Sequence, residues 1–177
     1  MPLRAVNVGL KLGPISLEGT WEPDESEIEA AWEMYIELAT RVSTQPLGAE
    51  EGLLREALES LHALFPTTRE ILRRRGPTVA RSKGEGQHSF AELAVYVLNY
   101  GIRPVLAKCH PLLVDHEARR PEGDSVTEHE AAWEHATELR AVLEELRSAL
   151  LDYANLLAEV AGVAPLIALD EMSDDPH

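Results

Sequence analysis

The apolar side chains between residues 132 and 160 recur at alternating steps of four and three positions. An α-helix turns once every 3.6 residues, so this spacing places them along one stripe of a single helix. A stripe of this length must be buried against other helices, and it therefore predicts an all-α bundle. Its members are Ala132, Ala136, Leu139, Leu143, Leu146, Leu150, Tyr153, Leu157 and Val160.

The first 22 residues follow a different period. Apolar residues alternate with other residues on both sides of the pair Gly13 and Pro14, which predicts a short β-hairpin. A two-stranded hairpin is barely stable alone in water. We therefore expect it to lie on the bundle or to pair with a second copy of itself, with Trp21 as a candidate anchor.

Two helices are predicted before a polar, glycine-bearing loop over residues 78–88. The first is expected to begin near Ser26, because Glu29 follows it at the spacing of a capping box. The second carries apolar residues over positions 54–72. Pro66 lies inside this segment, where it removes a backbone hydrogen bond, and it predicts a kink or a split.

The third helix is predicted over residues 90–113, with bends or separate short helices at its two prolines, Pro104 and Pro111. The fourth is predicted from Ser125 or Thr127 to Gly162. Its length, near 35 residues, corresponds to roughly 50 Å at 1.5 Å per residue. That length exceeds the thickness of a compact domain of this size, so we expect a homodimer in which a second subunit covers the projecting part.

These elements divide the chain into three parts: a hairpin arm (residues 1–22), a four-helix bundle with a long C-terminal helix (residues 23–164) and an acidic flexible tail (residues 165–177). The 177 residues are enough for one domain with a real core. Aromatic residues make up only 5% of the chain, so Leu, Ala and Val fill that core, as is typical of helical bundles.

The net charge of -15 argues against broad binding to nucleic acid and against docking on anionic membranes. One basic segment, over residues 69–83, stands apart from this balance. Its cations either offset a helix dipole or bind a partner. Cys109 is the single cysteine, which excludes an intrachain disulfide, and no apolar run reaches the length of a membrane span. Together with the lack of a signal-peptide pattern, this predicts a cytoplasmic protein.

Arg103 and His110 are separated by six residues on the third predicted helix. This spacing resembles the R-x(4-6)-H motif of the HEPN superfamily, small helical bundles that often dimerise and cut RNA without a metal. The resemblance implies that Arg103 would hold the scissile phosphate and that His110 would move the proton of the attacking ribose 2′-hydroxyl. Pro104 and Pro111, which follow the two residues, depart from the usual pattern.

Metal binding is a second kind of chemistry that the sequence suggests. A di-iron carboxylate site needs two Glu-x-x-His pairs on helices, and only Glu59 and His62 form such a pair inside a helix. Acidic residues at a helix start are more often a solvated first turn. We therefore expect no metal and no cofactor. The other candidate ligands are His110, Asp115, His116, His129, Glu130, Glu134, His135 and Glu138.

Trp32 and Trp133 are each spaced with the apolar face of a helix, where core packing is the default and a role as interface anchor is the alternative. The leading hypothesis is a non-enzymatic interaction or accessory subunit of a larger cytoplasmic assembly, dimeric and with a further protein partner. Its partner-binding candidates are Trp32, Trp133, Arg73, Arg74 and Arg75. The alternative is a HEPN-like ribonuclease or an inactive relative, and RNA is expected as a partner only in that case.

Overall fold

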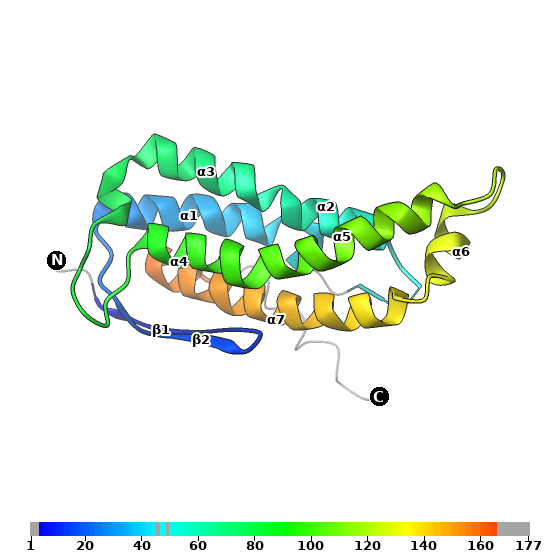
Figure 1. Cartoon of the computed structure of the whole chain (residues 1–177). Coiled ribbons are helices and arrows are strands. Elements are labelled where there is room, and N and C mark those ends of the chain that lie inside the picture. The colour runs from blue at the N-terminus through cyan, green and yellow to red at the C-terminus, as the bar shows by residue number, and fades with distance from the viewer. Residues whose placement is uncertain (1–3, 45–46, 49, 166–177) are drawn as a thin grey trace, which may run out of the picture.

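The computed structural model describes residues 4–44, 47–48 and 50–165. This part of the chain is mostly helical, with an antiparallel two-stranded hairpin near its N-terminal end, as the sequence predicts (Figure 1). The strands are β1 (Val6–Leu12) and β2 (Ile15–Trp21). The helices are α1 (Glu25–Ala39), α2 (Leu54–His62), α3 (Leu64–Arg75), α4 (Phe90–Tyr96), α5 (Arg103–Ala118), α6 (Val126–Ala131) and α7 (Ala136–Ala161), with 3-10 turns η1 (Val42–Thr44) and η2 (Pro77–Ala80) and the π-helical η3 (Val97–Ile102).

The hairpin packs on the helices of its own chain. Alternate residues of β1, from Val6 to Leu12, are buried against α7 and η3. Leu12 reaches the backbone at Gly101, where a side chain would collide with its methyl group. Trp21, at the end of β2, is fully buried with its ring 6.3 Å from that of Phe90. The hairpin therefore has a partner within the chain and supplies no reason for a second copy.

The first helix starts two residues earlier than the predicted capping box would place it. Asp24 is the N-cap: its carboxylate accepts the backbone N–H of Glu27 at 2.9 Å, and the Glu27 carboxylate accepts the backbone N–H of Asp24 at 2.9 Å. The prediction of a box at Ser26 and Glu29 was wrong because Asp caps a helix as well as Ser does, and Glu27 stands at the required distance from it.

The prolines divide the helices in two different ways. The predicted split near Pro66 is confirmed, because α2 ends at His62 and Pro66 is the third residue of α3, where a missing N–H costs little. The segment around Pro104 stays helical, with the wide turns of η3 joining α4 to α5. Proline cannot donate to the preceding turn, and a π-helical stretch before it accommodates that loss. Helix α5 continues through Pro111.

The fourth predicted helix is two helices, so the prediction of one helix near 35 residues was wrong. Ser125 does cap the first of them, α6, but the chain leaves helical geometry after Ala131 and resumes in α7. Just before the break, Glu130 accepts the backbone N–H of Leu54 at 2.7 Å, and such tertiary contacts can override local helix propensity. With 26 residues, α7 spans about 39 Å. The length of this helix therefore no longer supports a homodimer.

From Ala136 onward the apolar stripe is buried except for the half-buried Leu143, and Leu146 and Leu150 are buried as predicted, whereas Ala132 is exposed. Helix α7 packs against α1 on one side and β1 on another. In the described part of the chain, no helix is long and apolar enough to cross a membrane. The predicted acidic tail falls almost entirely outside the described residues.

Candidate functional site

An open groove with a volume of about 380 Å³ lies between α1 and α3. Trp32 is 43% exposed at this groove, although its spacing in the sequence matches the apolar stripe of α1. Its ring centroid lies 6.3 Å from that of Tyr35, which is fully buried, so the indole projects from a rigid base. We call this surface the α1–α3 groove; its lining residues are Trp32, Glu33, Ile36, Glu37, Thr67, Glu70, Ile71 and Arg74.

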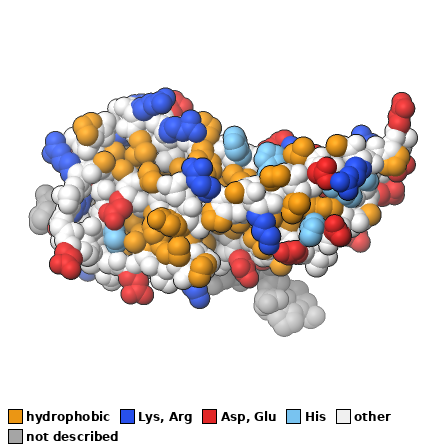
Figure 2. Space-filling model, viewed as in Figure 1, with side chains coloured by type: hydrophobic (Ala, Val, Ile, Leu, Met, Phe, Trp, Pro, Cys, Tyr) orange, Lys and Arg blue, Asp and Glu red, His pale blue; other side chains and the backbone are white. Residues whose placement is uncertain are grey.

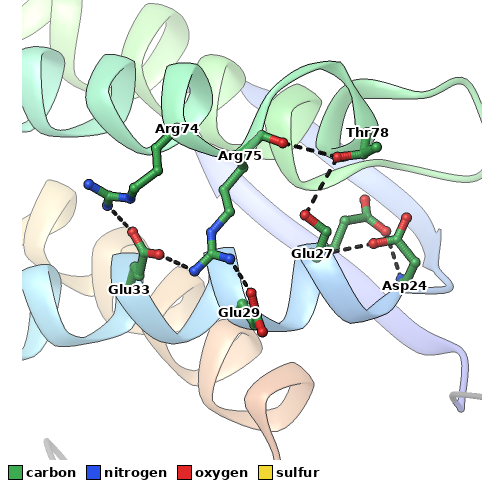
Figure 3. A network of polar contacts seen from close by, with 8 residues as sticks. Asp24, Glu27, Glu29, Glu33, Arg74, Arg75 and Thr78 are labelled. Atoms are coloured by element: carbon green, nitrogen blue, oxygen red, sulfur yellow. Dashed lines mark hydrogen bonds and ion pairs between the residues drawn. The ribbon is translucent and has the colours of Figure 1, made fainter.

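Ion pairs connect the two helices beside Trp32. The carboxylate of Glu33 forms ion pairs with both Arg74 and Arg75, and Arg75 also forms an ion pair with Glu29 (Figure 3). Figure 3 shows the two arginine side chains reaching down from α3 to carboxylates on α1. Arg74 makes a further contact with Glu70, at 3.2 Å. Two of the three arginines expected to bind a partner therefore hold α3 against α1.

The electrostatics of the groove follow from this arrangement. Burial alone would raise the pKa of Glu33, but the hydrogen bonds and charges of Arg74 and Arg75 outweigh it and hold that pKa below its ordinary value. Glu33 is therefore ionised at neutral pH. Hydrogen bonding to Glu33 likewise raises the pKa of Arg74. The groove thus presents an exposed indole beside carboxylates that are paired with arginines.

Arg73 differs from its two neighbours. It is exposed and has no carboxylate partner among the described residues, as is also true of Arg69, one turn before it. Figure 2 shows Lys and Arg side chains gathered over α3, with hydrophobic side chains spread over α4, α5 and α7. Of the predicted run, only Arg73 keeps its guanidinium available for a ligand.

Trp133 lies far from Trp32 in the chain and in a different setting. It is 6% exposed, and its ring packs 5.4 Å from that of His135 and 5.9 Å from that of His116. Its edge borders a mainly apolar groove of about 230 Å³ between α5 and α7. Most of the Trp133 side chain is therefore packed in the core. Cys109 borders the same groove, and burial raises the pKa of its thiol, which makes it a weak nucleophile.

Arg103 and His110 lie on one face of α5, because seven residues correspond to nearly two full turns. The Arg103 guanidinium sits 4.9 Å from the centre of the Phe65 ring, and its Nε donates to Asn99 at 3.1 Å. The half-buried His110 lies near Glu117, whose pKa is lowered mainly by its hydrogen bond from Arg55. A rise of about 10 Å separates the two candidate residues along the helix. Their catalytic role stays a prediction.

His116 and His129 form a contact that sequence reasoning missed. The two rings stack with centroids 4.0 Å apart, and the Nε2 of each donates to the backbone carbonyl of the other, at 2.7 and 2.8 Å. The pair closes the connection between α5 and α6. Among the described residues, no group of three or more His, Cys, Asp or Glu side chains is arranged to hold a metal ion. The sequence places the two histidines 13 residues apart and gives no signal of their pairing.

Glu27 is a second residue whose role the sequence hides. It is fully buried, and its carboxylate binds the N–H of Phe90 at 2.9 Å and the ammonium group of Lys83. It thereby connects α1, the loop before α4 and the start of α4. The capping-box spacing could have found its contact with Asp24, but no local pattern points to partners more than fifty residues away.

Comparison of the chain with protein-family models, with curated proteins and with solved structures found no match.

Proposed function

We propose that this chain is a four-helix-bundle interaction module, a non-enzymatic accessory subunit of a larger cytoplasmic assembly. The observation that supports the proposal best is Trp32, a large aromatic side chain left 43% exposed at the α1–α3 groove. Hiding such a ring from water is favourable, and Trp and Arg are the residues in which binding energy concentrates at protein interfaces. The ion pairs of Arg74 and Arg75 keep the platform under it rigid.

The partner of the groove is expected to be a protein, because an exposed indole beside paired charges offers apolar area that a protein surface can bury. A homodimer is retained as a separate part of this proposal, although neither the hairpin nor the length of α7 supports it any longer. The proposal includes no binding to a membrane.

The test is affinity capture from the native cell with mass spectrometry, using the wild-type chain and Trp32→Ala. We expect Trp32→Ala to lose the specific partner while its urea midpoint stays close to that of the wild type. Tyr100→Ala is the matched control, because Tyr100 is also an exposed aromatic residue, at 51%, but belongs to η3. Equal capture by wild type and Trp32→Ala would contradict the proposal.

A HEPN-like ribonuclease is the second candidate. It is favoured by one specific observation: Arg103 and His110 share a face of α5, and Arg103 is exposed without a carboxylate partner in the described chain. Incubation of the purified protein with total RNA in EDTA separates the candidates. The interaction module predicts no cleavage. Cleavage that survives EDTA and disappears in both Arg103→Ala and His110→Ala would establish the ribonuclease instead.

A further inference from the structure

The hairpin keeps one open edge. Thr20 of β2 donates to the carbonyl of Gly86 at 2.9 Å and accepts the N–H of His88 at 2.8 Å, so its backbone groups point away from β1. Its partner across the hairpin is Asn7, and in an antiparallel ladder both residues of such a pair point their backbone groups outward. The outer edge of β1 therefore carries the N–H and C=O groups of alternate residues, which are Asn7, Gly9 and Lys11.

This edge is accessible and unprotected. Its three outward residues are exposed, and their backbone groups have no hydrogen-bond partner in the described part of the chain. β1 follows the register of β2 without a bulge, contains no proline and carries Lys11 as its one charged residue. Prolines, bulges and charges are the features with which proteins protect a strand edge from further pairing. β1 thus offers its backbone to an added strand, as in the recognition of extended peptides by open sheet edges.

An acidic stripe of α7 lies beside this edge. Glu159 of α7 and Asn7 of β1 border the same open hollow, which has a volume of about 700 Å³. Asp152 precedes Glu159 by seven residues, and Glu145 precedes Asp152 by the same number. Seven residues correspond to nearly two turns, so the three carboxylates share one face of the helix.

The stripe follows β1 along its whole length. At one end of the strand, Val6 and Val160 border the same hollow. At the other end, Leu12 and Leu146 both pack against Gly101. β1 therefore runs antiparallel to the part of α7 that carries the three carboxylates, and Figure 1 shows the hairpin extended along this helix.

The charge and spacing of the stripe indicate what kind of strand would fit. Its carboxylates are exposed and form no ion pair with any described residue, including Arg4, which borders the hollow near Glu159. A strand added to β1 would turn alternate side chains toward α7, about 6.8 Å apart, whereas the carboxylates recur about every 10.5 Å. The long side chains of Lys and Arg can bridge this difference. The net charge of -15 also attracts a cationic segment.

We propose that the outer edge of β1 binds an extended basic segment of a partner protein, which adds to the hairpin as a third strand. The backbone of the segment pairs with the outward groups of β1. Its alternate Lys or Arg side chains face the acidic stripe of α7. This surface is separate from the α1–α3 groove, so the inference does not rest on the function proposed for Trp32.

The test uses a capped peptide of the same length as β1, seven residues, in which lysine alternates with threonine. Amide hydrogen exchange of the full chain is followed by NMR with and without this peptide. We expect exchange of the outward amides, at Asn7, Gly9 and Lys11, to slow by about tenfold or more at saturation, because they gain acceptors. The control peptide is methylated on the backbone nitrogens that would face β1, and it should give no protection.

Variants of the chain test the two parts of the site separately. Gly9→Pro removes an outward N–H that β2 does not use, and a side chain at Gly9 meets no atom within 4 Å. It should lose the peptide. Ser16→Pro is the matched control, because Ser16 pairs with Lys11 and its N–H points outward from the opposite edge. It should bind as the wild type does. Neutralising the stripe with Glu145→Gln, Asp152→Asn and Glu159→Gln together should weaken binding about tenfold.

Four results would overturn the inference. The outward amides of β1 could stay unprotected at saturating peptide. The methylated peptide could protect them equally, which would mean that charge alone attracts it. Gly9→Pro, with a urea midpoint near that of the wild type, could bind as tightly as Ser16→Pro. Finally, protection without peptide that increases with protein concentration would show that a second copy of the chain, rather than a basic segment, pairs with this edge.

Discussion

Removing the buried carboxylate of Glu27 is the perturbation whose effect the structure specifies most fully. In Glu27→Ala, the N–H of Phe90 loses its acceptor in a site closed to water, which costs about 1–3 kcal/mol. The reciprocal cap with Asp24 is lost as well, at about 1 kcal/mol. Lys83 keeps a largely buried charge without its carboxylate. Breaking a buried pair from one side typically costs about 3–5 kcal/mol in total, and we expect a loss in that range.

Urea denaturation at neutral pH, followed by tryptophan fluorescence, measures this loss. Glu29→Ala is the matched control, because Glu29 is a nearby exposed carboxylate of α1 whose one ion pair within the described residues is with Arg75. Its loss should stay below about 1 kcal/mol. Glu27→Gln should fall between the two variants, because its amide oxygen still accepts one N–H but carries no charge. A Glu27→Ala variant as stable as Glu29→Ala would refute the reasoning.

Three further predictions follow from the packing and the charges. Leu150→Ala, at a fully buried site, should lower the free energy of unfolding by about 2–5 kcal/mol, whereas Leu112→Ala, at an exposed site, should change it by less than about 1 kcal/mol; equal urea midpoints would contradict the helix packing. Because Arg74 and Arg75 lower the pKa of Glu33, its contribution is present above about pH 4.3 and is lost as the pH falls through the lowered pKa, so the stability gap between wild type and Glu33→Gln should close in acid. Light scattering should give twice the mass of one 19.6 kDa chain, and a monomer mass at all micromolar concentrations would exclude the homodimer.

The sequence predicted those parts of the fold that depend on local periodicity. The alternation over β1 identified the hairpin, and the step pattern from Ala136 to Val160 identified the buried face of α7. Pro66 located a real helix boundary. These signals come from residues close in sequence, whose side chains share one face of one element. Local pattern and tertiary packing agree there, so the prediction holds.

The predictions from the sequence were wrong where a contact between residues far apart in the chain determines the local structure. The break between α6 and α7 contains neither glycine nor proline, and Glu130, just before it, binds the N-terminus of α2, a distant contact that no local pattern predicts. The exposure of Trp32 could not be read from its spacing, since that spacing fits the buried stripe of α1 equally well. The partners of Arg74 and Arg75 on α1 were hidden for the same reason, because they depend on how α3 packs.

The central claim is that the α1–α3 groove binds a protein through Trp32. Its most direct test is a photo-cross-linking residue placed at position 32 of the chain in its native cell, with the same residue at position 100 as the control. The account predicts a discrete adduct from position 32, identified by mass spectrometry, and none from position 100. A well-expressed, folded protein that yields no adduct from position 32 would contradict the account.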